Sequence, residues 1–234
     1  MPAPIAWQQI KQTGNVPPPR SGHSIVTIGK THYLFGGLEK PEKFNDPKDL
    51  LPKNDLYALR IVNNQTVEWT LKQCSGDVPL GRAFHSACKV QEDKMFIFGG
   101  CYTSNERYND TYYLKLPAFQ WFQPPNQKSV GAPKNAMSKI GGPEPRAYHS
   151  MTYYKNKIVI FGGHGGVDYQ RTSFNDIYEL DLDSFEWRKP KTKGNPPEPR
   201  GGHIASLLAQ KDKLLIFGGW NFILQFHNLF VYDF

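Results

Sequence analysis

Residues 146–163 read Arg-Ala-Tyr-His-Ser-Met-Thr-Tyr-Tyr-Lys-Asn-Lys-Ile-Val-Ile-Phe-Gly-Gly, and this stretch decides the fold. An arginine is followed three positions later by a histidine, and an apolar run then ends in an aromatic residue and two glycines. The same order of markers occurs four times, which is the signature of a repeat architecture. The arginine, the histidine and the aromatic residue of the four units are Arg20, His23 and Phe35; Arg82, His85 and Phe98; Arg146, His149 and Phe161; and Arg200, His203 and Phe217.

Two further markers follow the glycine doublets of the first three units. The first is an Asn-Asp pair with an aromatic residue two positions later, and the second is a tryptophan. The fourth unit departs from the first marker, because Asn228 stands where the aspartate should be. Trp7 precedes the first arginine. The markers are Asn54-Asp55, Asn109-Asp110 and Asn175-Asp176, and the tryptophans are Trp69, Trp121 and Trp187.

Each unit predicts four short β-strands, which in the first unit are residues 23–28, 31–35, 56–61 and 67–71. The second strand is apolar on both faces in every unit, so both of its faces must be covered. Sheets stacked around a central axis cover them, whereas the 19 prolines oppose helices. We expect an all-β propeller with four recognisable blades of four antiparallel strands. The predicted domain is 1–234, with blades at about 20–71, 82–123, 146–189 and 200–234 and an N-terminal strand at 5–10.

These markers resemble the Kelch repeat family, and the resemblance covers essentially the whole chain. The arginine, the glycine doublet, the tyrosine and the tryptophan stand in the family's order. The long first and second units and the proline-rich lead-ins, such as residues 196–200, are most similar to Kelch domains of the host-cell-factor and Rab-effector types. The resemblance implies a β-propeller that binds protein partners. No BTB or BACK segment is seen, so a cullin-adaptor arrangement is not supported by this chain.

The positions of the first and last predicted strands within the repeat unit bear on whether the blades close into a ring. Residues 5–10 fit a fourth strand and residues 229–232 fit a third strand, so the N-terminal strand would complete the last blade and remove an exposed edge. Kelch rings usually have about five to seven blades, however, and four are found here. The chain therefore forms either a small ring or a part of a longer propeller, and we favour the longer propeller.

Markers that recur serve the framework, and a binding residue is needed only once, so binding residues should lie where the units differ. Because strands alternate in direction, the loops after the second strand and before the first strand share one face, which also carries the long loops 38–53 and 122–145. Tyr, Trp and Arg are the usual anchors of interfaces, although each one could instead fill a gap between blades. The partner-binding candidates on this face are Phe84, Tyr148, His164, Arg171, Trp220, Tyr102, Arg107 and Tyr169, followed by Tyr108, Phe222 and Gln225.

We expect a non-catalytic protein-interaction module or scaffold. One alternative is the regulatory Kelch domain of a larger enzyme, such as a phosphatase or an ubiquitin-ligase adaptor, and another is a metal-dependent propeller enzyme. Iron-dependent specifier proteins, which resemble Kelch domains, use regularly spaced carboxylates and histidine on one loop. Glu106 and Asp110 have that spacing, but Leu114 follows them. With no zinc or copper ligand spacing either, we expect no catalytic residue, no metal and no cofactor.

The net charge of +7 favours a protein partner with an acidic stretch. The basic run Arg188–Lys193 offers an alternative, binding to an acidic polymer or a membrane surface, but such runs are more often solvated loops. Nucleic-acid binding would require a basic stripe rather than one loop, so we do not expect it. No apolar stretch reaches the length of a membrane-spanning helix. Three cysteines without a Cys-x-x-Cys pair and an N-terminus unlike a signal sequence predict a cytoplasmic protein, with the nucleus as the alternative.

Overall fold

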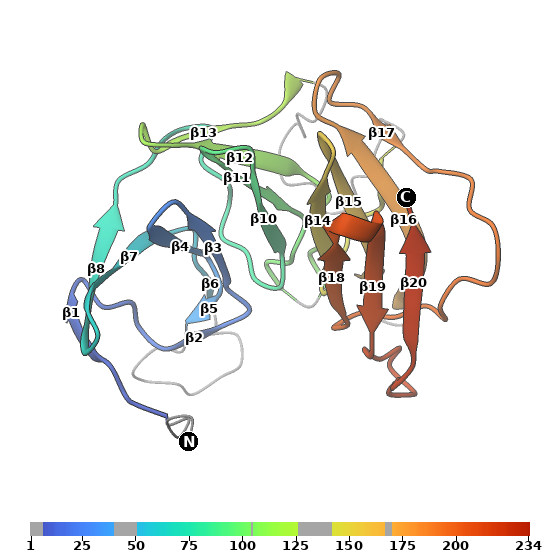
Figure 1. Ribbon diagram of the computed structural model, residues 1–234, viewed down its shortest axis with the longest axis horizontal. Coiled ribbons are helices and arrows are strands. Elements are labelled where there is room, and N and C mark those ends of the chain that lie inside the picture. Colours follow the sequence, from blue (N-terminus) through green and yellow to red (C-terminus); the bar gives the residue numbers. More distant parts are fainter. Residues whose placement is uncertain (1–6, 40–50, 104, 126–141, 167–169) are drawn as a thin grey trace.

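The computed structural model describes residues 7–39, 51–103, 105–125, 142–166 and 170–234. Within these ranges the chain is almost wholly β-structure, with no α-helix and a 3-10 turn at Ala209–Lys211. Four main sheets follow one another along the chain and form an arc (Figure 1). We call them blade one to blade four. This arrangement confirms the predicted all-β propeller class, and closure of a ring is not seen among the described residues.

Blades one and two each contain four antiparallel strands and a short added edge strand. Predicted and observed bounds agree closely in blade one, where the strand expected at 67–71 is observed at Thr66–Lys72. Blade one consists of β3 (Ser24–Ile28), β4 (Thr31–Phe35), β7 (Leu56–Asn63), β8 (Thr66–Lys72) and the edge strand β1 (Lys11–Gly14). Blade two consists of β10 (Ser86–Val90), β11 (Lys94–Phe98), β12 (Thr111–Lys115), β13 (Gln120–Phe122) and the edge strand β9 (Ser75–Gly76).

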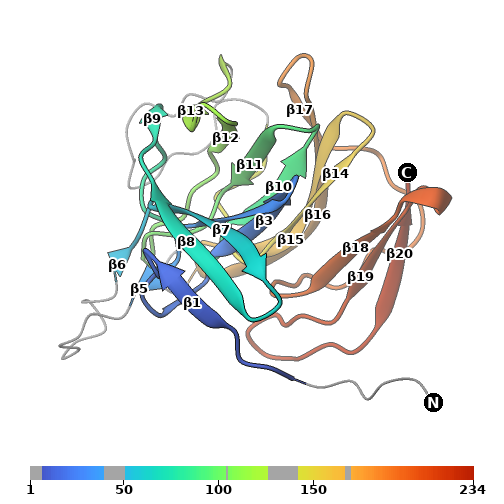
Figure 2. The same ribbon diagram turned by 60° about the vertical axis from the view of Figure 1, so that its left-hand side comes forward.

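Blades three and four differ from the expected four equal strands. In blade three the second strand runs through the glycine doublet to Gly165 instead of ending there, with a register shift between Phe161 and Gly163. Blade four has three described strands (Figure 2). Blade three consists of β14 (Ser150–Tyr154), β15 (Lys157–Gly165), β16 (Thr172–Asp181) and β17 (Trp187–Arg188), and blade four of β18 (Ile204–Leu208), β19 (Lys213–Phe217) and β20 (Leu229–Asp233). A further small sheet joins β2 (Arg20–Ser21), β5 (Leu38–Glu39) and β6 (Leu51–Pro52).

The N-terminal segment does not complete the last blade among the described residues. Residues 5 and 6 of the predicted strand 5–10 lie outside the described residues, and residues 7–10 are not in a strand. The first strand, β1, pairs in parallel with β8 of blade one. Among the described residues, β20 of blade four pairs only with β19. The small ring is therefore not seen here, and the longer propeller stays a prediction.

The core lies between successive blades, since each sheet packs its alternating apolar residues against both neighbours. Between blades one and two, Phe35 packs on Trp121 with ring centroids 5.0 Å apart, and both side chains are fully buried. Between blades two and three, Phe98 and Trp187 repeat this contact at 5.2 Å. Burial of aromatic rings of this size supplies much of the free energy that holds the blades together.

A buried arginine side chain joins the strands of each blade at the end that carries the glycine doublet. Arg82 donates to both carboxylate oxygens of Asp110 at 2.6 and 3.1 Å and to the carbonyl of Gly99 at 2.9 Å. Arg20 with Asp55 and Arg146 with Asp176 repeat the paired contact. In blade four Asn228 replaces the aspartate, and a nearby glutamate supplies the missing carboxylate. Arg200 donates to Asn228 at 2.8 Å and to the carboxylate of Glu198 at 2.7 Å.

The histidine markers connect neighbouring blades near the axis. His85 shares a hydrogen bond of 2.8 Å with Ser24 of the preceding blade, and His203 shares one of 2.9 Å with Ser150. His149 and Ser86 make the same contact at 2.5 Å. The recurring arginines and histidines therefore serve the framework, which leaves the loops free to differ.

Candidate partner-binding site

A line of backbone hydrogen bonds crosses the blades at the residue before each histidine marker. The amide of Phe84 donates to the carbonyl of Gly22 at 2.8 Å, the amide of Tyr148 to Phe84 at 3.0 Å, and the amide of Gly202 to Tyr148 at 2.8 Å. All four residues have positive φ, between 55° and 68°. We call these four residues the axial line. It sets one side chain from each of the two middle blades side by side near the centre of one face.

The two glycines of the axial line make room for aromatic neighbours. A Cβ atom at Gly22 would lie 2.8 Å from the Phe84 ring, and one at Gly202 would lie 3.0 Å from the indole nitrogen of Trp220. A side chain at either position would push the neighbouring ring aside, so both positions favour glycine, which also adopts positive φ without strain. Blades one and four therefore place Gly22 and Gly202, which have no side chain, against the rings of Phe84 and Trp220.

Five aromatic side chains meet at this face, and we call them the aromatic cluster. Phe84 stacks on Tyr148 with centroids 4.3 Å apart, and Tyr148 lies 6.2 Å from Trp220 in an edge-on arrangement. His164 and Phe222 each approach the Trp220 ring, at 4.4 and 5.0 Å. All five residues come from loops or strand ends of blades two, three and four. Aromatic rings gathered on a rigid scaffold in this way form a common type of recognition surface.

Next to the cluster, the loop after β19 exposes consecutive apolar side chains. Phe222, Ile223 and Leu224 are 39%, 88% and 59% exposed. The backbone around them is fixed, because Asn221 accepts hydrogen bonds from the amides of Ile223 and Leu224 at 3.3 and 2.8 Å. An ordered, exposed apolar run beside an aromatic cluster is a feature that a partner's apolar side chains would cover. The sequence signal that could have found it is the run Phe-Ile-Leu inside a loop.

Two arginines lie beside the cluster, and we call them the basic pair. Arg107 is partly buried and donates a hydrogen bond to the carbonyl of Gly166, while Arg171 is exposed. Burial, and in addition the positive charge of Arg171, lowers the pKa of Arg107. Among the described residues neither arginine forms a salt bridge, and the buried Nε of Arg107 has no hydrogen-bond partner. A carboxylate arriving here would satisfy both groups.

The structure brings most of the predicted site residues to one face. Phe84, Tyr148, His164 and Trp220 join the aromatic cluster, and Arg107 and Arg171 form the basic pair. Tyr102 is 36% exposed on the loop of blade two that carries Arg107. Tyr169 lies outside the described residues.

His164 differs from the expectation that it contacts a partner, because its side chain is only 1% exposed. Its Nδ1 lies 3.0 Å from the Ser173 hydroxyl, and its ring lies under Trp220 and Phe222. Burial, with a smaller contribution from Arg107, lowers the pKa of His164 to about 4, so the ring is neutral at neutral pH. It supports the exposed members of the cluster from below instead of touching a partner.

The carboxylates considered for an iron site are arranged differently from such a site. Asp110 is held by Arg82 within the framework, and Leu114 is fully buried in the blade interface. No group of three or more metal-binding side chains is present in the described ranges. Asp110 is therefore already engaged in a structural ion pair.

The fold and the face together define a repeat propeller whose irregular loops lie on a frame of recurring strands. The family model of the KLHDC2/KLHL20/DRC7 Kelch-repeats domain matches residues 47–234. This chain belongs to the Kelch-repeat family, which confirms the resemblance inferred from its markers.

Relatives of different activity share this repeat. The chain is 30% identical to N-(sulfonatooxy)prop-2-enimidothioate sulfolyase of Thlaspi arvense, over 92% of this chain and 56% of that protein. It is 29% identical to Kelch domain-containing protein 3 of Bos taurus, over 91% and 51%, and 30% identical to host cell factor 2 of Homo sapiens, over 93% and 26%. The chain thus spans about half or less of these relatives. The family fold is generally a non-catalytic interaction fold.

None of the described helical segments has the length and apolar character needed to cross a lipid bilayer.

Proposed function

We propose that this chain is a protein-interaction module that binds an acidic segment of a partner across the aromatic cluster and the basic pair. The observation that carries the proposal is the placement of five aromatic rings on loops of one face, beside two arginines without a carboxylate partner among the described residues. In this arrangement the partner's apolar side chains cover Tyr148, Trp220 and Phe222, and its carboxylates bind Arg107 and Arg171.

The contrast with the framework arginines supports this assignment. Arg82 and Arg146 are fully buried and each has its own aspartate, as expected for charges that serve stability. Arg107 is partly desolvated and has another arginine as its charged neighbour, which is unfavourable for the isolated chain. A charge arrangement that costs stability in the free protein and is relieved by an anion is typical of a binding surface.

Catalysis is a weaker alternative, although the sulfolyase is among the relatives. The framework pair uses Asp110, and the loop of blade two offers Glu106 without a second free carboxylate at the expected spacing. A role as the regulatory part of a larger enzyme is compatible with the same binding face, since the chain spans only part of its relatives. In that case the domain would still act by binding.

A displayed library of acidic peptides with interspersed apolar residues provides the probe for the first test. We expect peptides selected on the wild-type chain to lose about tenfold or more in affinity with Tyr148→Ala, because an aromatic anchor in an interface contributes about 1–4 kcal/mol. Fluorescence polarisation measures the affinity, and thermal melting shows that the variant is folded.

Arg171→Glu should weaken the same peptides and reduce the salt dependence of binding. The matched control is Lys211→Glu, which makes the same charge change in the exposed turn between β18 and β19, at the opposite ends of the strands. Equal losses with both charge reversals would show that net charge alone attracts the peptides and would contradict the proposed face. Selection of no acidic peptide would contradict the partner class.

A further inference from the structure

The two arginines of the basic pair are carried by short β-pairings above blades two and three. Cys101 bridges both Ala83 and Arg107, so the loop of blade two between Cys101 and Arg107 doubles back on itself. Arg171 directly precedes β16 of blade three. Arg107 reaches from blade two to blade three, where its guanidinium group donates to the carbonyl of Gly166. The strands of two neighbouring blades therefore place both side chains at one point of the face.

The basic pair has no negative charge of its own among the described residues. Burial lowers the pKa of Arg107, and Arg171 lowers it further through its positive charge. The other groups that act on Arg107 by charge, Cys101 and Tyr148, are not carboxylates. The four framework arginines differ, because each binds a carboxylate at 2.5 to 2.7 Å. By the same one-to-one ratio, two adjacent guanidinium groups call for two negative charges.

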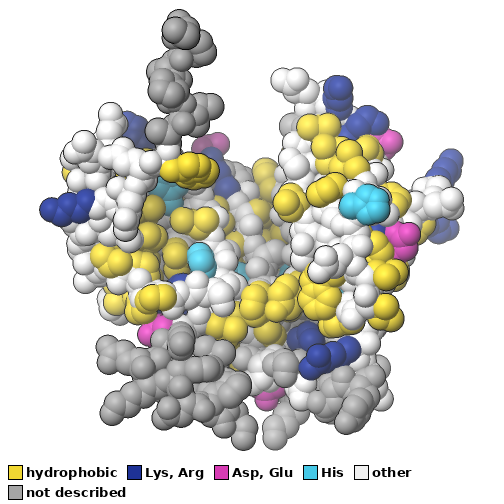
Figure 3. Space-filling view, turned by 90° about the horizontal axis from the view of Figure 1, so that it is seen from below, with side chains coloured by type: hydrophobic (Ala, Val, Ile, Leu, Met, Phe, Trp, Pro, Cys, Tyr) yellow, Lys and Arg dark blue, Asp and Glu magenta, His cyan; other side chains and the backbone are white. Residues whose placement is uncertain are grey.

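Tyr148 belongs to both features of the face. Its ring stacks on Phe84 at 4.3 Å and stands 6.2 Å from Trp220, within the aromatic cluster. Burial raises the pKa of the Tyr148 hydroxyl and the charge of Arg107 opposes this rise, which places the hydroxyl near the basic pair. Figure 3 shows hydrophobic side chains next to a group of Lys or Arg side chains on the hollowed surface between the ends of the arc. A ligand whose ring covers the cluster can therefore reach the arginines with a charged end.

A phosphate monoester is the side-chain group that meets both arginines at once. It carries about −1.5 to −2 charges at neutral pH, and its oxygens are strong hydrogen-bond acceptors. Two carboxylates of a peptide could supply the same charge, but in one small site they would repel each other and one would take up a proton. On an extended segment, adjacent side chains also point to opposite sides. One dianion therefore fits the pair better than two separate carboxylates.

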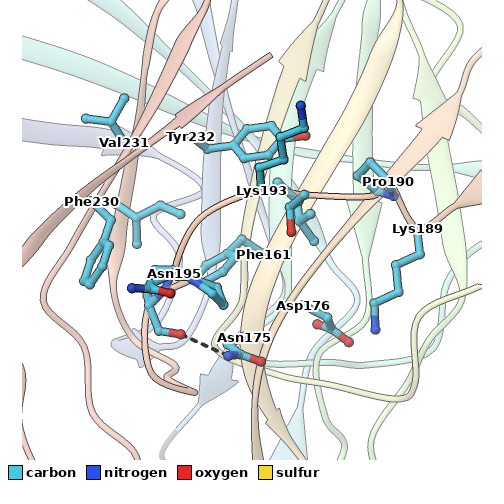
Figure 4. Close-up of a pocket in the computed structure, with 15 residues that line it drawn as sticks. Phe161, Asn175, Asp176, Lys189, Pro190, Lys193, Asn195, Phe230, Val231 and Tyr232 are labelled. Carbon is cyan, nitrogen blue, oxygen red and sulfur yellow. Dashed lines mark hydrogen bonds between the residues drawn. The ribbon is translucent and has the colours of Figure 1, made fainter.

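A second group of cations provides a contrast. Lys189 and Lys193 line a cavity of about 260 Å³ between blades three and four (Figure 4). Asp176 lines the same cavity, and its carboxylate binds Arg146 at 2.5 Å. These lysines are exposed and share their cavity with a carboxylate. Arg107 of the basic pair is partly buried instead, and no carboxylate accompanies it in the described part of the chain.

We propose that the anion bound by this face is a phosphotyrosine of the protein partner, a proposal that rests on the proposed binding of an acidic segment. The phosphotyrosine ring lies against Tyr148 and Trp220, and its phosphate binds the guanidinium groups of Arg107 and Arg171. The Tyr148 hydroxyl donates a further hydrogen bond to the phosphate. A phosphoserine would also reach the arginines, but its short side chain brings no ring to the aromatic cluster. Phosphorylation of the partner then switches binding on, because an unmodified tyrosine brings a ring without the charge.

Four sets of fluorescent peptides test the proposal on the full 234-residue chain. They share degenerate flanking residues and have phosphotyrosine, sulfotyrosine, tyrosine or glutamate at the centre. Sulfotyrosine has the shape of phosphotyrosine but a single negative charge, so it isolates the effect of the second charge. At about pH 7.5 we expect the phosphotyrosine peptides to bind about tenfold more tightly than the sulfotyrosine peptides in fluorescence polarisation. The tyrosine peptides should bind most weakly.

Lowering the pH gives an independent measure of the second charge. A phosphate monoester loses this charge with a pKa of about 6, so at about pH 5 roughly a tenth of it is a dianion. The affinity of the phosphotyrosine peptides should then fall about fivefold relative to that of the sulfotyrosine peptides, which remain monoanions. Both sets contact the same protein groups, so their ratio compares the two ligands.

Arg171→Gln removes one of the two positive charges. We expect the preference for phosphotyrosine over sulfotyrosine to fall from about tenfold to about threefold or less. Lys211→Gln, which makes the same charge change in the exposed turn between β18 and β19, should leave this preference unchanged. Thermal melting shows that both variants are folded.

The two proposals for this face fail in different ways. Glutamate peptides that bind as tightly as phosphotyrosine peptides and are weakened by Arg171→Gln would leave the acidic-segment function standing and overturn the phosphotyrosine. Equal affinity for phosphotyrosine and sulfotyrosine, or an unchanged preference in Arg171→Gln, would overturn it as well. If no set of peptides binds, both proposals are overturned.

Discussion

Blades two and four carry the same arginine, histidine and phenylalanine markers, yet they differ in how many of their faces are covered. Blade two lies between two neighbours, so Phe98 is completely buried and Arg82 has a buried aspartate. Blade four has a neighbour on one side only: Phe217 is 48% exposed, and Arg200 uses an asparagine and an exposed glutamate instead. The same residue type at the same repeat position therefore contributes differently to stability, according to whether a blade stands on each side.

The largest difference is expected at the phenylalanine markers. Phe98→Ala should lower the free energy of unfolding by about 3–5 kcal/mol, because it leaves a cavity between blades two and three. Phe217→Ala should cost about 1 kcal/mol or less, since half of this ring is in solvent. Urea unfolding followed by fluorescence measures both. Equal losses would show that both faces of blade four are covered in solution.

A somewhat smaller difference is expected at the ion pairs. Asp110→Asn gives blade two the side chain found in blade four, but it leaves Arg82 without a carboxylate and should cost about 3 kcal/mol. Asn228→Ala removes one hydrogen bond from Arg200, which keeps Glu198, and should cost about 1 kcal/mol. The same unfolding experiment compares them. If the two changes cost the same, the glutamate does not compensate for the missing aspartate.

The smallest difference concerns the dependence of stability on pH. Burial, followed by the charges of Arg82 and His23, lowers the pKa of His85 from 6.5 to about 3. Below pH 6.5 the unfolded chain binds a proton that the folded chain does not bind, so stability present above that pH is lost as the pH falls toward 3.

His85→Gln should therefore remove about 2 kcal/mol of the loss between neutral pH and about pH 4.5. His23→Gln, at the exposed end of the arc, should remove less. Unfolding midpoints at the two pH values check this comparison. A larger effect at His23 would place that end of the arc in a buried environment.

The blades could be predicted from the recurring residues, because each of these residues meets the same backbone requirement in every blade. Gly100, for example, has a φ of 92°, and a Cβ there would lie 2.8 Å from the carbonyl of Ala83. Such a position favours glycine in every unit, so the glycine recurs and can be recognised in the sequence. The location of the predicted site face followed from strand direction in the same way.

The remaining features depend on contacts that the repeat does not encode. Glu198 replaces an aspartate from a different position in its blade, and His164 lies beneath Trp220 because two loops of irregular length fold over it. The parallel pairing of β1 with β8 links residues far apart in sequence without a local signal. These details depend on tertiary contacts, so the sequence pattern indicated which loops share one face but not how deeply each side chain is buried there.

The positive φ of Phe84 and Tyr148 has a consequence for engineering this domain. A bulky residue in this conformation costs roughly 1–2 kcal/mol relative to glycine, and the equivalent positions of blades one and four are indeed glycines. Glycine at both middle positions would relieve this backbone strain. It would also remove the stacked rings at the centre of the proposed recognition face, so that relaxed backbone and affinity oppose each other at two backbone angles.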